Sequence, residues 1–402
     1  MEFRKTFSMK TMHWYDNPIK ITVLGRGNAG CLTALHYGYH TRNKQNISVE
    51  LLYDPHIPPE KVGQATLLEP PRLLWAALGL NWYDNPIQTT PKFGILYENW
   101  GKKNDKVFHP FAFDSVGLHY NPTKLQSTIL NSKYFKVEEK HIDNYDDIDS
   151  DFIFDCRGKH ITNWNDYKDL HNPLNAVLVG EGKSKECDIN WTRAVATPDG
   201  WTFVIPNTTR TTSYGYLYND KITPIEKASA NFKKLFNLAK QGIYLNEKVD
   251  NFKFKNYVAK KPIIDKRIIL GGNRLFFLEP LESTAIQAYL FWARIVWDWM
   301  IEEKTTPVGV ARKFHTYIEQ TQNFIMWHYL YGSKYDTPFW QAARKFKIKD
   351  PLFTRILARV KQTPMTELRD MGVDFNSAEY GQWQPWNFKY WYKGMTKGKE
   401  LT

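Results

Sequence analysis

The sequence predicts an α/β fold with a helical C-terminal part, and two observations indicate it. The first 280 residues contain several short β-branched and apolar runs, each bounded by turn residues or by a stretch with helical spacing. From Ser283 onward two long apolar helical stretches replace this pattern, at residues 284–303 and 311–332. We therefore expect a mixed-sheet module over residues 18–285 and a helical subdomain over residues 286–402 packed on it.

The first strand is expected at residues 20–24 (KITVL), followed by the glycine turn GRGNAG and a helix. A second strand is expected in ISVELLYD, which ends at Asp54. Further strands are expected in FGILYENW, with Lys92 at its start, in DFIFD, in TFVIP and in KRIIL. The helix that follows residue 283 then begins the C-terminal part.

GRGNAG supplies Gly25, Gly27 and Gly30 at GxGxxG spacing. The first glycine permits a tight turn, the second lets a pyrophosphate approach the backbone, and the third lets helix and strand pack closely. The N–H groups at the helix start then face the phosphates. Asp54, at the end of the next strand, is positioned to bind ribose hydroxyls. The pattern predicts a Rossmann-like dinucleotide site but does not distinguish FAD from NAD.

Composition restricts the class of protein. The 54 Lys and Arg against 42 Asp and Glu give a net charge of +12, which attracts anions such as dinucleotides and halide. Three cysteines are too few for a disulfide framework and lack zinc-ligand spacing. With no signal-peptide pattern and no apolar run near ~18 residues, we expect a cytoplasmic protein without a membrane partner. The 15% aromatic content fits either a ring-rich core or an aromatic pocket.

Four further segments carry a resemblance to a known family: GWTFVIP (200–206), FLEPLESTA (277–285), YDTPFW (335–340) and VGQAT (62–66). In this order they resemble the flavin-dependent halogenases of the tryptophan-halogenase type, and the compact length is similar to that of phage-encoded members. Two positions depart from the family pattern. Phe203 stands where GWxWxIP has its second Trp, and Ala285 stands where FLEPLESTG has Gly.

The resemblance implies a flavin-monooxygenase-type fold and an enzyme that uses FAD, dioxygen and halide. Reduced FAD would come from a separate NAD(P)H-dependent flavin reductase, because no second glycine motif is evident. Hypohalous acid would pass through a tunnel, shielded from side reactions, to an electron-rich aromatic substrate. Bromide and iodide are easier to oxidise than chloride and are the expected halides. The implied cofactor contacts are Gly25, Gly27, Asn28, Ala29, Gly30, Asp54, Ala65, Asn273 and Ile286.

Lys92 and Glu282 align with the family's catalytic pair. The lysine would hydrogen-bond hypohalous acid or form a haloamine, and burial shifts a lysine pKa readily. Glu282 would stabilise the charged ring and take its proton, with Ser283 orienting it and Glu279 as the weaker competitor. The halide would bind backbone N–H groups of Thr284 and Ala285 at a helix start, where the alanine methyl disfavours positive φ.

Two regions are expected to surround the substrate, near residues 92–120 and 200–206. His109 and Phe111 would sandwich the aromatic ring, and Tyr390 and Trp391 would lie on the other side of the pocket. The tunnel would be lined by Trp201, Phe203, Ile205 and Pro206. Tryptophan-specific members carry an acid where this sequence has Asn387. Because an amide cannot neutralise an ammonium group, we expect phenols or indoles rather than free tryptophan.

Two alternatives remain open. A flavin-dependent aromatic monooxygenase would hydroxylate its substrate directly and would need neither halide nor Lys92. A basic, aromatic-rich nucleic-acid-binding protein would use the positive charge and the rings for phosphate contact and base stacking. The second alternative leaves the glycine turn and the LEST segment unexplained, so we expect no nucleic-acid partner. The sequence does not determine the oligomeric state, and a homo-oligomer is one of the alternatives.

Overall fold

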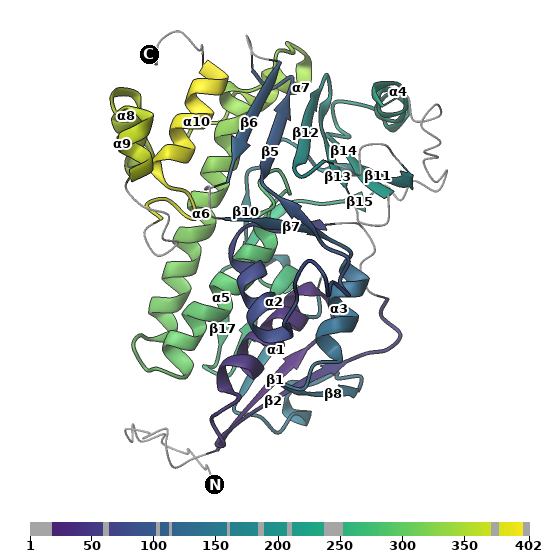
Figure 1. Cartoon of the computed structure of the whole chain (residues 1–402), viewed down its shortest axis with the longest axis vertical. Helices are drawn as coiled ribbons and strands as arrows, with labels where there is room; N and C mark the ends of the chain where they lie inside the picture. The colour runs from purple at the N-terminus through teal and green to yellow at the C-terminus, as the bar shows by residue number, and fades with distance from the viewer. Residues whose placement is uncertain are drawn as a thin grey trace.

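The computed structural model describes residues 18–58, 64–101, 105–111, 115–158, 161–183, 189–206, 211–236, 252–370 and 378–396. Val62 and Gly63 of the VGQAT segment, and also Cys187, lie outside the described residues. Figure 1 shows two large sheets toward opposite ends of the molecule, with the long helix α6 running beside them. Within the described ranges, no helix is both long enough and apolar enough to cross a lipid bilayer.

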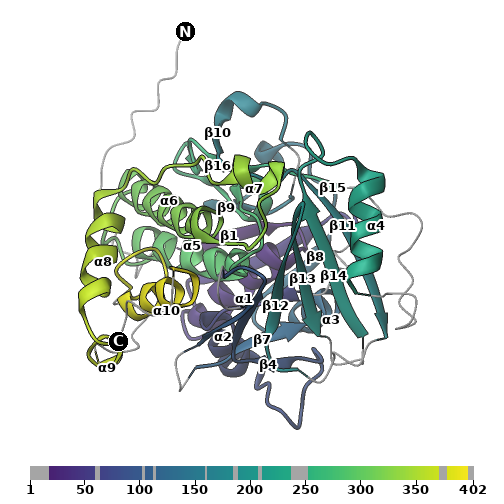
Figure 2. The same ribbon diagram turned by 90° about the horizontal axis from the view of Figure 1, so that it is seen from above.

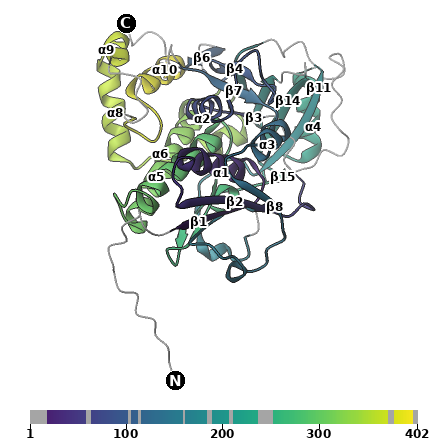
Figure 3. The ribbon, with the colours of Figure 1, turned by 60° about the horizontal axis from the view of Figure 1, so that its bottom comes forward.

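The first sheet carries the glycine turn. Its strand order is β17-β18-β9-β1-β2-β8, and every neighbouring pair is parallel except β17 with β18. The strands are β1 (Ile19–Leu24), β2 (Ile47–Tyr53), β8 (Lys136–Glu139), β9 (Phe152–Asp155), β17 (Ile263–Ile264) and β18 (Ile268–Leu270). Helix α1 (Asn28–Thr41) follows the glycine turn and lies between this sheet and helix α5 (Figure 3). The α/β prediction with a Rossmann-like unit is confirmed.

The second sheet has the order β15-β11-β14-β13-β12-β5-β6 and is antiparallel except between β12 and β5. Its strands are β5 (Gly94–Glu98), β6 (Lys106–Pro110), β11 (Ala176–Lys183), β12 (Thr192–Thr197), β13 (Gly200–Pro206), β14 (Thr211–Tyr218) and β15 (Phe252–Lys253). Helix α4 (Ile225–Leu235) covers one face, where Phe232 packs against Tyr216 (Figure 2). The predicted GWTFVIP strand is β13, and it is buried along its whole length.

Two small sheets connect the large ones. One contains β3 (Gln64–Ala65), β7 (Gly117–Tyr120) and β4 (Thr90–Lys92), and the other contains β10 (Tyr167–Leu170), β16 (Asn256–Ala259) and β19 (Phe276–Phe277). In sequence, helix α2 (Glu69–Leu78) lies between β3 and β4, and helix α3 (Pro122–Leu130) follows β7. Lys92 was expected to begin the strand of FGILYENW. It instead ends β4, because Phe93 interrupts the run and β5 begins at Gly94.

The C-terminal part is helical, as expected from its spacing. It comprises α5 (Thr284–Met300), α6 (Pro307–Tyr331), α7 (Pro338–Ala343), α8 (Pro351–Gln362), α9 (Met365–Asp370) and α10 (Pro385–Thr396). Two adjacent helices, α5 and α6, lie side by side in Figure 2. One continuous hydrophobic core contains residues of the first sheet and of these helices, so the helical part is not packed separately. Helix α10 contacts both α8 and strand β6, which brings the C-terminal helices to the edge of the second sheet.

Candidate active site

Lys92 is buried in the protein interior, although lysine is among the residue types most often exposed. Its Nζ atom donates a hydrogen bond to Ser283 Oγ at 2.9 Å and lies 5.3 Å from the centre of the Phe111 ring. Burial lowers the pKa of Lys92 to about 7, and the nearby Glu282 carboxylate limits the decrease. The lysine predicted from the sequence therefore has a substantial free-amine fraction at neutral pH.

Glu282 lies beside Ser283 and is also buried. Its Oε1 atom accepts a hydrogen bond from the Tyr97 hydroxyl, and His328 Nε2 lies 2.7 Å from the same oxygen. Burial alone would raise the pKa of Glu282, but hydrogen bonding and charge interaction with His328 hold it below its ordinary value. The carboxyl group is thus kept ionised inside the protein. The structure brings Lys92 and Glu282 close together, and their catalytic roles stay a prediction.

The sequence analysis did not identify Tyr97 and His328 as residues of the site. Ile95 and Tyr97 are two residues apart on β5, so both lie on the same buried face of the strand. A tyrosine on that face, in the strand that follows Lys92, was a usable signal. His328 sits on the apolar helix α6, 46 residues from Glu282, and a lone histidine on such a helix carries no signal of its partner. Its contact depends on how α6 packs against the turn before α5.

Ser283 has a left-handed backbone conformation, with φ 54° and ψ 35°. Such a conformation is uncommon outside glycine and is a form of strain often found at functional sites. Its side chain accepts the Lys92 hydrogen bond and does not cap α5, so the first N–H groups of the helix have no side-chain cap. Ala285 lies within the first turn of α5 and has no positive φ, so its methyl group causes no backbone strain. The expected halide position at Thr284 and Ala285 therefore has free helix N–H donors.

Glu279, the weaker competitor in the same segment, is also fully buried. Burial raises its pKa to about 8, partly offset by the polar groups of Tyr329 and Trp201. The Tyr329 hydroxyl and the Trp201 indole lie close enough to this carboxyl group to interact with it. Glu279 is therefore mostly protonated at neutral pH, which makes it less suited than Glu282 to accept a proton.

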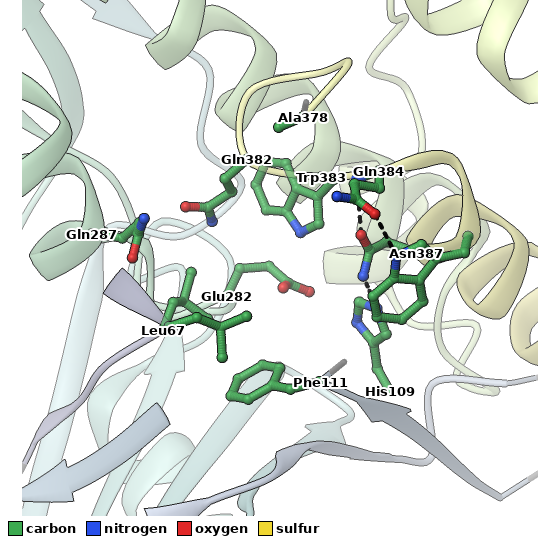
Figure 4. A pocket seen from close by; sticks show the side chains of 12 residues that line it. Leu67, His109, Phe111, Glu282, Gln287, Ala378, Gln382, Trp383, Gln384 and Asn387 are labelled. Carbon is green, nitrogen blue, oxygen red and sulfur yellow. Dashed lines mark hydrogen bonds between the residues drawn. The ribbon is translucent and has the colours of Figure 1, made fainter. Parts of the chain in front are cut away.

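An open pocket leads to Glu282 (Figure 4). His109 and Phe111, which the sequence predicted to hold the substrate ring, both line it. Asn387 Nδ2 lies 3.0 Å from His109 Nε2, and burial lowers the pKa of His109 to about 4. The imidazole is therefore neutral and accepts this hydrogen bond. The complete lining is Leu67, Leu68, His109, Phe111, Glu282, Gln287, Ala378, Gln382, Trp383, Gln384, Trp386 and Asn387.

The expected aromatic pair Tyr390 and Trp391 does not line this pocket. Trp391 is fully buried behind Glu282, with its ring centre 3.8 Å from that of His328 and 4.4 Å from that of Tyr97. Tyr390 contacts the lining residues His109 and Trp386 from behind, at ring-centre distances of 6.3 and 6.0 Å. The lining rings are instead Trp383 and Trp386, because the turn before α10 and the first turn of that helix face the cavity.

The four residues expected to line a tunnel all lie on β13 and are buried. Trp201, Phe203 and Ile205 alternate along the strand and so share one face. The indole N–H of Trp201 donates to the Tyr329 hydroxyl at 2.9 Å. None of the four, Pro206 included, lines the pocket beside Glu282. Their role in a tunnel therefore stays a prediction.

The glycine turn forms a cradle that fits a dinucleotide. Gly25 has φ +100°, and a Cβ atom at Gly30 would lie 1.9 Å from the Gly25 carbonyl oxygen. A Cβ atom at Gly27 would meet no atom within 4 Å, so this glycine borders open space at the start of α1. Since α1 has no side-chain cap, its first N–H groups can face a phosphate. The donor set thus suits the pyrophosphate of FAD.

Two of the other predicted cofactor residues, Ala65 and Asn273, belong to segments that lie near this cradle. Asn28 donates to Gln64 Oε1 at 2.9 Å, which places β3 and Ala65 near the first turn of α1. Gly272, just before Asn273, lies against Ala29, since a Cβ atom there would be 2.7 Å from the Ala29 methyl. Ile286 is buried in the first turn of α5.

Asp54 follows the end of β2, as expected, but its carboxylate already has partners. Oδ2 lies 2.7 Å from His141 Nδ1, and Oδ1 accepts the backbone N–H of His56 at 2.8 Å. The hydrogen bond with His141, followed by that from His56, lowers the pKa of Asp54. A ribose contact would have to share this carboxylate with His141, so the ribose role stays a prediction.

Comparison with known proteins agrees with this arrangement. A family model described as tryptophan halogenase matches residues 20–146 and 133–396. The tryptophan 6-halogenase ThaL of Streptomyces albogriseolus is 22% identical over 484 aligned positions, which cover 94% of this chain and 88% of that enzyme.

Two solved structures share the fold. They are the tryptophan 6-halogenase SttH of Streptomyces toxytricini (TM-score 0.74, 17% identity, 94% of this chain and 90% of that chain) and a tryptophan halogenase of Shewanella frigidimarina (TM-score 0.75, 16% identity, 97% and 91%). The chain therefore belongs to the tryptophan halogenase family, and it is a flavin-dependent halogenase that uses FAD, dioxygen and halide with an aromatic substrate and a separate flavin reductase.

Proposed function

We propose that this enzyme halogenates a neutral, electron-rich aromatic compound of the phenol or indole type at Lys92 and Glu282. The observation that carries the proposal is the buried Lys92 amine bonded to Ser283, next to an ionised Glu282 at the edge of an aromatic pocket. Burying an amine and a carboxylate in one site is costly unless both are held by partners. Such an arrangement is typical of a catalytic site with shifted pKa values.

Lys92 receives the halogen in this proposal. The cradle near Gly27 would hold reduced FAD, which with dioxygen and halide would supply hypohalous acid. The passage of this oxidant through the interior beside β13 is part of the proposal, because a passage closed to bulk water would limit side reactions. The free amine of Lys92 takes the halogen and releases water, a step that the lowered pKa favours. The lysine nitrogen then presents the halogen to the ring.

Glu282 acts as the base. When the ring carbon forms its bond to the halogen, the halogen–nitrogen bond breaks and the ring becomes positively charged. The ionised Glu282 stabilises that charge and takes the ring proton. That proton then passes to the Lys92 nitrogen, which loses the halogen, so the carboxylate and the free amine are both restored. Tyr97 and His328 orient the carboxylate through their hydrogen bonds. The pair thus ends each cycle in its starting state.

The pocket supports a neutral substrate. Apart from Glu282 and the neutral His109, its described lining consists of apolar, aromatic and amide side chains, with no Lys or Arg. An amino acid would need partners for both an ammonium and a carboxylate group. A phenol or an indole needs neither, and Phe111 and Trp386 offer ring faces and edges for packing.

The experiment is a panel of phenols and indoles, assayed with chloride, bromide or iodide and a purified flavin reductase. We expect halide-dependent mass gain on several members, with bromide or iodide turned over faster than chloride. Exclusive turnover of free tryptophan would contradict the proposed substrate class. A hydroxylated product formed without halide would instead favour the aromatic monooxygenase.

A further inference from the structure

Gln382 lines the pocket from the short turn before Trp383, and Figure 4 shows it across Glu282 from Phe111. Its Oε1 atom accepts a hydrogen bond from the Tyr317 hydroxyl at 2.9 Å. Its Nε2 atom is buried and makes no hydrogen bond to any described residue. A buried amide donor without a partner is costly, so this group requires an explanation.

The orientation of the amide follows from Tyr317. This tyrosine is buried on α6, and among the described residues its hydroxyl bonds to Gln382. A phenol is a stronger hydrogen-bond donor than acceptor, and an amide oxygen is a good acceptor. Tyr317 therefore fixes the oxygen of Gln382 toward α6, which directs the NH₂ group away from α6.

The other amides of the lining have their groups engaged. Gln287 accepts from the backbone N–H of Glu69 and donates to the Glu69 carboxylate. Asn387 donates to His109 and accepts from the backbone N–H of Gln384. Gln384 Oε1 accepts from the Trp386 indole. Within the described lining, the buried NH₂ group of Gln382 is thus the amide donor for which the described residues supply no partner.

We propose that Gln382 is a specificity residue that donates a hydrogen bond to an oxygen or nitrogen acceptor on the substrate. The preferred substrate is then a neutral aromatic with such an acceptor. A carboxylate acceptor is disfavoured because the ionised Glu282 lines the same pocket. This inference rests on the proposed function, because it assumes that the substrate occupies this pocket.

Binding to the full-length protein tests the inference without turnover. Dissociation constants are measured for indole and for the azaindole isomers, in which one C–H of the six-membered ring is replaced by an acceptor nitrogen. A second pair compares an indole carrying an ether side chain with one carrying an alkyl chain of equal length. Comparing the wild type with Gln382→Met cancels the intrinsic differences between the ligands.

We expect at least one acceptor-bearing ligand to lose about threefold to tenfold more affinity than its acceptor-free partner when Gln382 becomes Met. The control Gln384→Met removes an amide that is engaged with Trp386 and should leave this preference unchanged. Tyr317→Phe keeps Gln382 but frees its amide to rotate, so it should reduce the preference partially. Tyr317→Phe also tests the proposed donor role of Gln382 if Gln382→Met fails to fold.

Equal losses for every pair would overturn the inference, and so would a preference of the wild type for ligands with an extra donor. Tight, acceptor-dependent binding without any halogenated product would instead contradict the proposed function and leave the role of Gln382 intact. Halogenation of indole without any acceptor preference would contradict the role of Gln382 and leave the proposed function intact.

Discussion

His328 Nε2 lies 2.7 Å from Glu282 Oε1, while the other ring nitrogen, Nδ1, lies 2.7 Å from the backbone carbonyl oxygen of Phe324. A carbonyl oxygen only accepts, so Nδ1 carries a hydrogen. The contact between Nε2 and Glu282 Oε1 is a hydrogen bond that holds the carboxylate against the ring. In the proposed mechanism the base is therefore positioned by a histidine rather than standing alone.

Replacing His328 should alter the acid side of the pH profile. His328 lowers the pKa of Glu282, so in His328→Phe this pKa rises and the carboxylate is lost at higher pH. We expect kcat to fall about 10-fold to 100-fold and its acidic limb to move to higher pH. His328→Gln keeps a hydrogen-bond donor and should recover part of both effects. If the acidic limb of the pH profile were unchanged in both variants, His328 would have only a packing role.

The lysine should impose an ionisation near neutrality. Burial lowers the pKa of Lys92 to about 7. In the proposed mechanism the free amine is the form that takes the halogen. We therefore expect kcat/KM for the aromatic substrate to rise with pH through about 7. In Glu282→Gln the charge that raises the lysine pKa is absent, so the remaining activity should rise at lower pH. A rate that falls above pH 7 would indicate that the ammonium form, acting as a hydrogen-bond donor, is the active one.

Glu279 should make folding stability depend on pH. Its pKa is raised from 4.5 to about 8, so between these values the folded state binds more protons than the unfolded state. Its contribution to the free energy of unfolding then decreases as pH rises, by about 1.4 kcal/mol per pH unit. Glu279→Gln should become progressively more stable than the wild type from pH 5 to 7, measured by denaturant midpoints. The control variant Glu367→Gln, at an exposed position, should show no such trend.

Free tryptophan should be a poor substrate compared with indole. Within the described lining, Glu282 is the acid that could meet an ammonium group, and it is already bonded to Tyr97 and His328. Asn387→Asp should raise the kcat/KM ratio of tryptophan to indole about tenfold, because a charged hydrogen bond adds roughly 1.5 kcal/mol. The ratio is measured by competition in one reaction. No change would show that position 387 does not contact the amino acid.

The sequence predicted those features that depend on local chain geometry. The glycine turn needs only neighbouring residues, and Gly25, Gly27 and Gly30 adopt the expected cradle. The sequence analysis assigned Lys92 to the wrong strand. Phe93 separates β4, which contains Lys92, from β5, but the two strands form one continuous run in the sequence.

The pocket wall was less predictable from the sequence. Trp391 and Trp386 lie on one short helix, and only the packing of α10 against α8 and β6 decides which ring meets the substrate. His328 and Tyr317 reach the site from α6, and nothing near them in the sequence indicates their partners.

The most direct test of the account is bromination of indole by the wild type and by Lys92→Met, with the same reductase, FAD and bromide. Methionine fills the volume of the lysine without an amine. We expect bromoindole formation, followed by mass spectrometry, to fall at least about 100-fold in Lys92→Met while flavin oxidation continues. Lys106→Met, an exposed position on β6, should keep the wild-type rate. Wild-type bromination by Lys92→Met would contradict the central claim that this buried amine delivers the halogen.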